Sequence, residues 1–213
     1  MASRYGLERL NQNSVNRPGE QEVVRQTLYD YQVYPVAGQT QLIFYQVPQG
    51  QGGKTKNDTN METAGSLPAP KKFLIEQIEV QFFPGGVPSV FGAQAAATQI
   101  NDVYTVAQSG FLDLFIGSKS YLTEAPIGRF PASNRLAVNA AFSDQTTIAA
   151  ALQTRSGYAS FAGAPYRVEP NIALVATQNF NVTLNWPTAI ALPSGVNARI
   201  GVVLKGLLYR NSQ

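Results

Sequence analysis

Residues 50–55, which read Gly-Gln-Gly-Gly-Lys-Thr, contain the residue types that cradle a phosphate group. A P-loop also needs a glycine five positions before Gly53, where this chain has Pro48. It further needs a helix directly after the loop, because the helix N-terminus binds the anion. The stretch KNDTNMET after Thr55 has no apolar helical face. We therefore predict a long loop over residues 48–70 and no nucleotide site.

Carboxylates are the second group that could do chemistry, because two of them can act as the acid and base of a glycoside hydrolase. Glu76 and Glu79 have odd spacing within one predicted strand, which places them on opposite faces. Five others belong to separate elements, and the sequence brings no two of them together: Asp102, Asp113, Glu124, Asp144 and Glu169. The chain has no calcium loop of the EF-hand pattern. We interpret these carboxylates as single solvated side chains.

The chain contains no Cys and no His. Catalytic groups of the Ser-His-Asp and Cys-His kinds are therefore excluded. The thiolate and imidazole ligands of ordinary zinc sites are excluded as well. We expect that the protein is not an enzyme, and we expect no catalytic residue, no cofactor, no cofactor-binding residue and no metal ligand.

Aromatic side chains could instead serve recognition. Phe82, Phe180 and Trp186 are in phase with strand alternation, which favours a place in the core. Tyr29, Tyr31 and Tyr34 lie together near the start of the predicted domain. Because Tyr is enriched at protein interfaces, these three are our candidates for contacts between subunits.

The composition is poor in charge. Charged residues make up 14% of the 213 residues, against roughly 25% in an average globular protein. The net charge is only +3, and Arg and Glu alternate in the N-terminal segment instead of forming a basic run. This pattern disfavours a strong nucleic-acid-binding arm, although weak contact with nucleic acid on an inner face stays open. An uncharged polar surface suits packing against other protein, because no ions have to be desolvated.

The elements that must position these residues are mostly strands. Strict alternation in residues 179–186 places Phe180, Val182, Leu184 and Trp186 on one face. Alternation also predicts strands at 73–83, 111–116 and 198–210, and a further strand region at 165–177. Residues 32–47 read as strand, and their apolar run at 42–45 indicates burial on both sides.

Two segments have helical spacing. Residues 91–108 predict an amphipathic helix whose apolar stripe includes Val103 and Tyr104. Ser143 has the position of an N-cap for a short helix through Leu152. We expect an all-β fold: a single jelly-roll or Greek-key β-sandwich over residues 28–213 with one or two helical insertions, preceded by an N-terminal arm over residues 1–27. We expect neither a cleaved signal peptide nor a transmembrane segment.

Together the polar arm (1–27), the helical insertion (91–108), NFNVTLNWP (179–187) and RIGVVLKGLLYR (199–210) give a pattern that resembles the jelly-roll capsid proteins of icosahedral viruses, bacteriophages in particular. The resemblance implies a virion structural protein, either a major capsid subunit or a minor or vertex protein. It also implies self-assembly into trimers, pentamers or a lattice, with copies of itself and other capsid proteins as partners. The chain has the length of one jelly roll.

Two other classes remain open. A carbohydrate- or receptor-binding β-sandwich, such as a decoration, fibre or lectin-like module, would gather exposed aromatic, acidic and amide side chains. An enzyme is disfavoured by the missing His and Cys.

Overall fold

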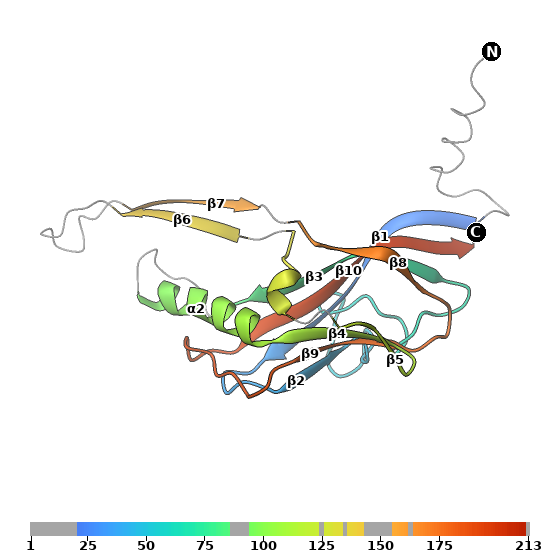
Figure 1. The fold of residues 1–213 in the computed structure, drawn as a ribbon, viewed down its shortest axis with the longest axis horizontal. Coiled ribbons are helices and arrows are strands. Elements are labelled where there is room, and N and C mark those ends of the chain that lie inside the picture. Colours follow the sequence, from blue (N-terminus) through green and yellow to red (C-terminus); the bar gives the residue numbers. More distant parts are fainter. Residues whose placement is uncertain are drawn as a thin grey trace, which may run out of the picture.

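Two antiparallel sheets packed face to face form the body of the protein (Figure 1). The computed structural model describes residues 21–85, 94–123, 126–133, 136–142, 155–161 and 164–211. The buried side chains of both sheets meet in one core between them. The predicted all-β sandwich is therefore confirmed.

Sheet A contains, in spatial order, β1 (Gln21–Tyr34), β10 (Ala198–Asn211), β3 (Lys72–Phe83) and β8 (Tyr166–Leu174). Sheet B contains β2 (Gln41–Phe44), β9 (Phe180–Asn185), β4 (Phe111–Ile116) and β5 (Lys119–Leu122). A separate two-stranded ribbon consists of β6 (Leu136–Phe142) and β7 (Arg155–Phe161). The helix α2 spans Gln94–Ser109, and a 3-10 turn, η1, spans Ile127–Arg129.

The pairing of the strands is nested along the chain. The first strand, β1, pairs with the last, β10, while β2 pairs with β9 and β3 with β8, all antiparallel. Two hairpins lie inside the β3–β8 pair: β4 with β5 in sheet B, and the separate ribbon of β6 with β7. The chain therefore follows one long hairpin that is rolled up, so that β10 also pairs with β3 and β9 also pairs with β4.

Alternating burial builds the core as the sequence predicts. In β9, Phe180, Val182 and Leu184 are buried, while Asn181 and Asn185 face outward. In β10, Ile200, Val202 and Leu204 point into the same core. Each apolar side chain of this size contributes roughly 1.5–3 kcal/mol when it is removed from water.

A β-bulge in β3 overturns one prediction about its carboxylates. Against β10 the register shifts between Ile75 and Gln77, so Glu76 is an extra residue of β3 there. The register against β8 shifts at the same place, where residues 168–171 of β8 are unpaired. An extra residue resets the alternation of a strand. Glu76 pairs with Arg25, and Glu79 bonds with Gln81 on the same outer face of sheet A. The prediction that Glu76 and Glu79 face opposite sides is wrong.

The predicted strand over residues 32–47 is two strands. β1 ends at Tyr34, a turn follows, and β2 begins at Gln41. Burial on both sides is also wrong, because Ile43 is 43% exposed between the buried Leu42 and Phe44. β1 begins at Gln21, so the last residues of the predicted arm belong to sheet A. The predicted helix from Ser143 to Leu152 lies outside the described residues.

The helix predicted at 91–108 corresponds to α2, but its buried face differs from the predicted stripe. Val103 and Tyr104 are exposed, Tyr104 by 64%, whereas Asp102 and Val106 are buried. Two polar contacts fix this orientation. Asp102 Oδ1 accepts a hydrogen bond from the Ser194 backbone N–H at 2.9 Å, and the Val106 carbonyl accepts one from the Trp186 indole at 3.1 Å. Within the described part of the chain, no helix is long and apolar enough to cross a membrane.

Candidate functional site

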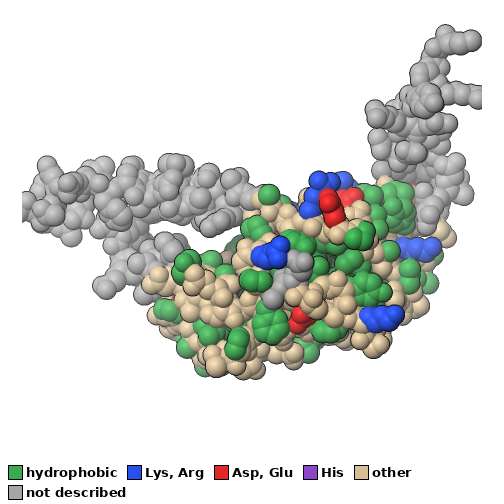
Figure 2. Space-filling model, viewed as in Figure 1, with side chains coloured by type: hydrophobic (Ala, Val, Ile, Leu, Met, Phe, Trp, Pro, Cys, Tyr) green, Lys and Arg blue, Asp and Glu red, His purple; other side chains and the backbone are tan. Residues whose placement is uncertain are grey.

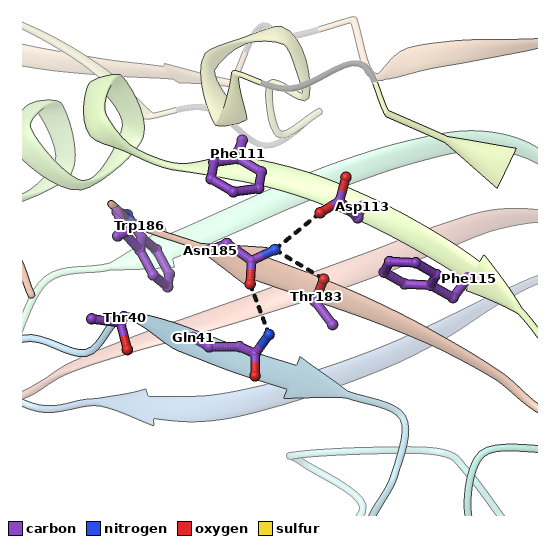
Figure 3. Close-up of a pocket in the computed structure, with 8 residues that line it drawn as sticks. All are labelled: Thr40, Gln41, Phe111, Asp113, Phe115, Thr183, Asn185 and Trp186. Atoms are coloured by element: carbon purple, nitrogen blue, oxygen red, sulfur yellow. Dashed lines mark hydrogen bonds between the residues drawn. The ribbon is translucent and has the colours of Figure 1, made fainter. Parts of the chain in front are cut away.

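The outer face of sheet B carries a shallow, open depression of about 530 Å³ (Figure 3). Strand register arranges its residues in two rows. Gln41 of β2, Asn185 of β9 and Phe111 of β4 are partners in the first row. Ile43, Thr183 and Asp113 are partners in the second. Larger side chains surround the short Thr183, which therefore forms the floor of the depression.

The Asn185 side chain is held by hydrogen bonds from three sides (Figure 3). Its Nδ2 donates to Asp113 Oδ2 and to Thr183 Oγ1, both at 3.1 Å. Its Oδ1 accepts a hydrogen bond from Gln41 Nε2 at 2.9 Å. An amide with both ends engaged has one fixed orientation, so this network presents its remaining donors and acceptors in a preset arrangement.

Asp113 lies between Phe111 and Phe115 on the outer face of β4. Burial raises the pKa of the Asp113 carboxyl, and the hydrogen bond from Asn185 opposes that rise. Asp113 is the one ionisable side chain among the residues that line the depression: Thr40, Gln41, Phe111, Asp113, Phe115, Thr183, Asn185 and Trp186. Such a surface can hold a neutral polar ligand, but it offers no nucleophile paired with a base.

Sequence reasoning named Asp113 and the outward row of β9, but it did not bring them together. Both strands show alternation, which predicts that Asp113, Thr183 and Asn185 face away from the core. What the sequence does not contain is the register that makes Asp113 the partner of Thr183. Register depends on the pairing of strands that lie far apart in the chain.

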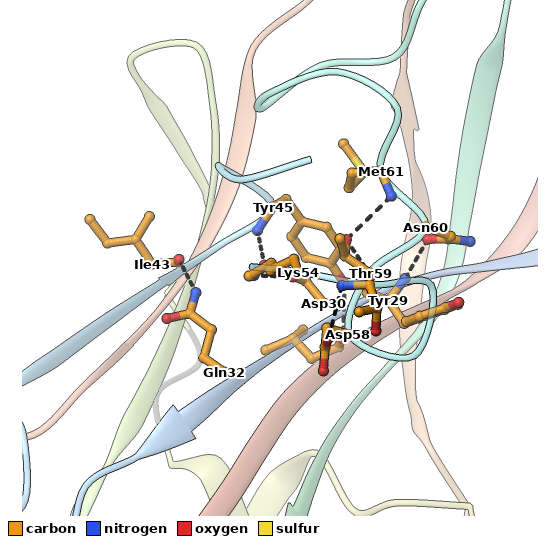
Figure 4. A network of polar contacts seen from close by, with 12 residues as sticks. Tyr29, Asp30, Gln32, Ile43, Tyr45, Lys54, Asp58, Thr59, Asn60 and Met61 are labelled. Carbon is orange, nitrogen blue, oxygen red and sulfur yellow. Dashed lines mark hydrogen bonds and ion pairs between the residues drawn. The ribbon is translucent and has the colours of Figure 1, made fainter. Parts of the chain in front are cut away.

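The lysine of the phosphate-like loop is part of a second polar network (Figure 4). Its ammonium group binds the fully buried carboxylate of Asp30, which also accepts the Tyr45 backbone N–H at 2.7 Å. Burial raises the pKa of Asp30, while Lys54 and Tyr45 act to lower it. Lys54 is therefore occupied by a structural carboxylate, and a helix does not follow Thr55. These contacts agree with the predicted loop and disfavour a phosphate site.

Two of the three candidate interface tyrosines lie on the outer face of sheet A. The rings of Tyr29 and Tyr31 are 5.9 Å apart, and Tyr31 donates a hydrogen bond to Gln81 Oε1 at 2.6 Å. Tyr34 is fully buried and donates to the Ile190 carbonyl at 2.8 Å. Its candidacy as a contact between subunits is therefore wrong, because odd spacing from Tyr31 turns it into the core.

The aromatic surface around Tyr31 continues into exposed apolar residues. Val33, Arg199 and Phe83 form one row across β1, β10 and β3, and Val33 and Phe83 are 60% and 42% exposed. The Arg199 guanidinium lies 4.2 Å from the centroid of the Tyr31 ring. Tyr31 in turn lies over Gly201, where an added Cβ would come within 2.1 Å of the ring. We call Tyr31, Val33, Phe83 and Arg199 the sheet A patch.

The other predicted carboxylates are apart from one another. Glu79 pairs with Lys205 at 3.1 Å, and Glu169 pairs with Arg167 at 3.5 Å on the surface. Glu79 and Asp102, a residue of α2, are both buried, so the interpretation of these two carboxylates as solvated side chains is wrong. Glu124 and Asp144 lie outside the described residues. In the described part of the chain, no group of three or more acidic residues could hold a metal ion.

The ribbon of β6 and β7 extends beyond the end of the sandwich (Figure 1). The two strands pair with each other from Leu136 and Phe161 to Phe142 and Arg155, and they join neither sheet. The ribbon lies in the connection between β5 of sheet B and β8 of sheet A.

Comparison with known proteins finds no matching family model, no matching curated protein and no matching solved structure. Functional inference for this chain therefore depends on its own surfaces.

Proposed function

We propose that this protein is a virion structural protein, a self-assembling capsid subunit whose copies, with other capsid proteins, form an icosahedral shell. In this proposal the sandwich is a single jelly roll. The nested strand order supports it, because an eight-stranded double sheet built from such rolled hairpins is the fold of many capsid and lectin domains. A fold alone does not assign a function, so the argument depends on surfaces that need a partner.

The observation that carries the proposal is the β6–β7 ribbon. A two-stranded hairpin on its own is marginally stable at best in water. In its register, Leu136, Val138 and Ala140 of β6 are the partners of Phe161, Ala159 and Gly157 of β7, and Phe142 is the partner of Arg155. The ribbon adds no strand to either sheet of its own chain. A neighbouring subunit that packs against the ribbon would stabilise it.

The surface of the body supports the same proposal. Figure 2 shows a face on which charged side chains are few and most of the surface consists of hydrophobic and uncharged atoms. The sheet A patch adds Tyr and Arg next to exposed apolar residues, a combination enriched at the energetic centres of interfaces. Such surfaces associate with little desolvation of charge.

A pair of neighbouring substitutions tests the proposal. Val138→Asp replaces an apolar residue of β6 by an acidic one, and Asn139→Asp introduces the same carboxylate at the next position, where the residue is already polar. We expect wild-type protein and Asn139→Asp to form large closed oligomers by light scattering and electron microscopy, and Val138→Asp to remain small. Thermal unfolding followed by Trp186 fluorescence should be equal in all three, because Trp186 is in the core of the sandwich.

Two results would contradict the proposal. One is wild-type protein that stays monomeric at every concentration tested. The other is equal assembly of Val138→Asp and Asn139→Asp, because the ribbon would then contribute no contact between subunits.

A further inference from the structure

The depression on sheet B has the features of a binding surface that is separate from the assembly surfaces. Phe111, Asp113 and Phe115 are alternate residues of one strand, so an aromatic ring lies on each side of a carboxylate. The strand rise places the Cα atoms of Phe111 and Asp113 about 7 Å apart and those of Phe111 and Phe115 about 14 Å apart. A short oligosaccharide could span this length.

The polar groups restrict the class of ligand. Asp113 Oδ1 and Gln41 Oε1 have no hydrogen-bond partner among the described residues, and the Thr183 hydroxyl, which accepts from Asn185, keeps its own hydrogen to donate. Acceptors and a donor therefore lie side by side, which suits hydroxyl groups because each hydroxyl both donates and accepts. An entirely apolar ligand would leave these groups buried without partners, at a cost of about 1–3 kcal/mol each.

The charge of the lining residues restricts the class of ligand further. No Lys or Arg lines the depression, so an anionic ligand such as a phosphate would find no counter-charge. The apolar faces of Phe111 and Phe115 could pack against the C–H faces of sugar rings. We infer that the outer face of sheet B binds a neutral saccharide, with Phe111 and Phe115 stacking on its rings and Asp113, Gln41 and Thr183 bonding to its hydroxyls.

Binding can be tested on the full chain with a panel of neutral trisaccharides, namely maltotriose, cellotriose and chitotriose. Saturation-transfer NMR reports which of them contacts the protein, and titration gives Kd. We expect at least one to bind with millimolar Kd, since the depression is shallow and open. Phe115→Ala and Asp113→Ala should each weaken binding roughly tenfold, the change that corresponds to about 1.4 kcal/mol.

Tyr121→Ala is the matched control, because Tyr121 is an exposed aromatic residue of β5 in the same sheet but outside the depression. It should bind as wild type does, and thermal unfolding should show that all variants are folded. Absence of saturation transfer from every trisaccharide would overturn the inference, as would equal binding by Phe115→Ala, Asp113→Ala and wild type. A change in oligomeric state of Phe115→Ala without saccharide binding by wild type would assign this face to a protein partner instead.

The inference is independent of the capsid proposal. Loss of saccharide binding in Phe115→Ala with unchanged assembly would support it, whereas loss of assembly in Val138→Asp concerns the ribbon alone.

Discussion

At the scale of single residues, the buried carboxylate of Asp30 connects two other segments of the chain to β1. Its partners come from two different segments: the Tyr45 N–H directly after β2 and the Lys54 ammonium from the long loop. A buried carboxylate without such partners would be strongly disfavoured in its charged form. Burial still raises the pKa of Asp30 above its ordinary value, so desolvation outweighs the attraction of Lys54.

Removal of Lys54 should therefore destabilise the protein in a pH-dependent manner. We expect Lys54→Met to lower the free energy of unfolding at neutral pH by about 3 kcal/mol, because it leaves a buried charge uncompensated. A carboxyl with a raised pKa stabilises the fold most below its ordinary pKa, and this contribution is lost as the pH rises through the raised value. The variant raises that pKa further, so its deficit should shrink as the pH falls toward 4.

Urea unfolding followed by Trp186 fluorescence at neutral and acidic pH measures this deficit. Lys56→Met is the control, because Lys56 is exposed two positions further along the same loop. A deficit that is independent of pH, or one that Lys56→Met shares, would contradict the role assigned to the Asp30–Lys54 pair.

At the scale of elements, the long loop after β2 covers the free edge of β1. The Asn60 side chain makes the hydrogen bonds that a neighbouring strand would make. Its Oδ1 accepts the Tyr29 N–H at 3.0 Å, and its Nδ2 donates to the Thr27 carbonyl at 2.7 Å. The Tyr31 N–H donates to the Asp58 carbonyl at 2.7 Å. An uncovered edge strand is a template for pairing with another chain, so this loop limits which part of sheet A can pair with a partner.

Asn60→Ala should open this edge locally. We expect the free energy of unfolding to fall by about 1–3 kcal/mol, the cost of leaving buried backbone groups without partners. Native-state hydrogen exchange at the Tyr29 amide should accelerate, while the Val202 amide in the centre of sheet A should change little. Asn57→Ala, in the exposed turn of the same loop, serves as the control, and equal exchange at Tyr29 in both variants would contradict the model of the covered edge.

The elements also show how far the sequence could predict this fold. β9 and β10 follow from alternation because each has one face in the core and one face outside it. The bulge at Glu76 has no local signal, since it arises where β3 must pair with both β10 and β8. The buried face of α2 could not be predicted for a similar reason. Trp186 and Ser194, which lie far along the chain, form the hydrogen bonds that turn Val106 and Asp102 toward the sandwich. The sheet B depression depends on the register of three strands, so it could not be predicted from the sequence either.

At the scale of the whole molecule, the small number of charged residues limits how much ion pairs can contribute to any association between copies. Several charged side chains are paired within the chain, such as Lys54 with Asp30 and Lys205 with Glu79. The side chains of Val33 and Phe83 in the sheet A patch are exposed and apolar, and the proposed assembly would bury them. Burial of apolar surface is driven mainly by entropy near room temperature, so its strength decreases on cooling.

Assembly of the wild-type protein should therefore respond to temperature more than to salt. Between about 0.01 M and 1 M salt the Debye length falls from about 30 Å to about 3 Å, which would weaken any association held by surface charges. We expect the concentration at which oligomers first appear by light scattering not to rise over this range, and to fall when the sample is warmed from refrigerator to room temperature. Phe83→Ser should raise that concentration at every salt level, because it removes apolar area from the sheet A patch, whereas Tyr104→Ser on the exposed side of α2 should not. A threshold that rises steeply with salt would instead mean that ion pairs hold the subunits together, which so few exposed charges make difficult.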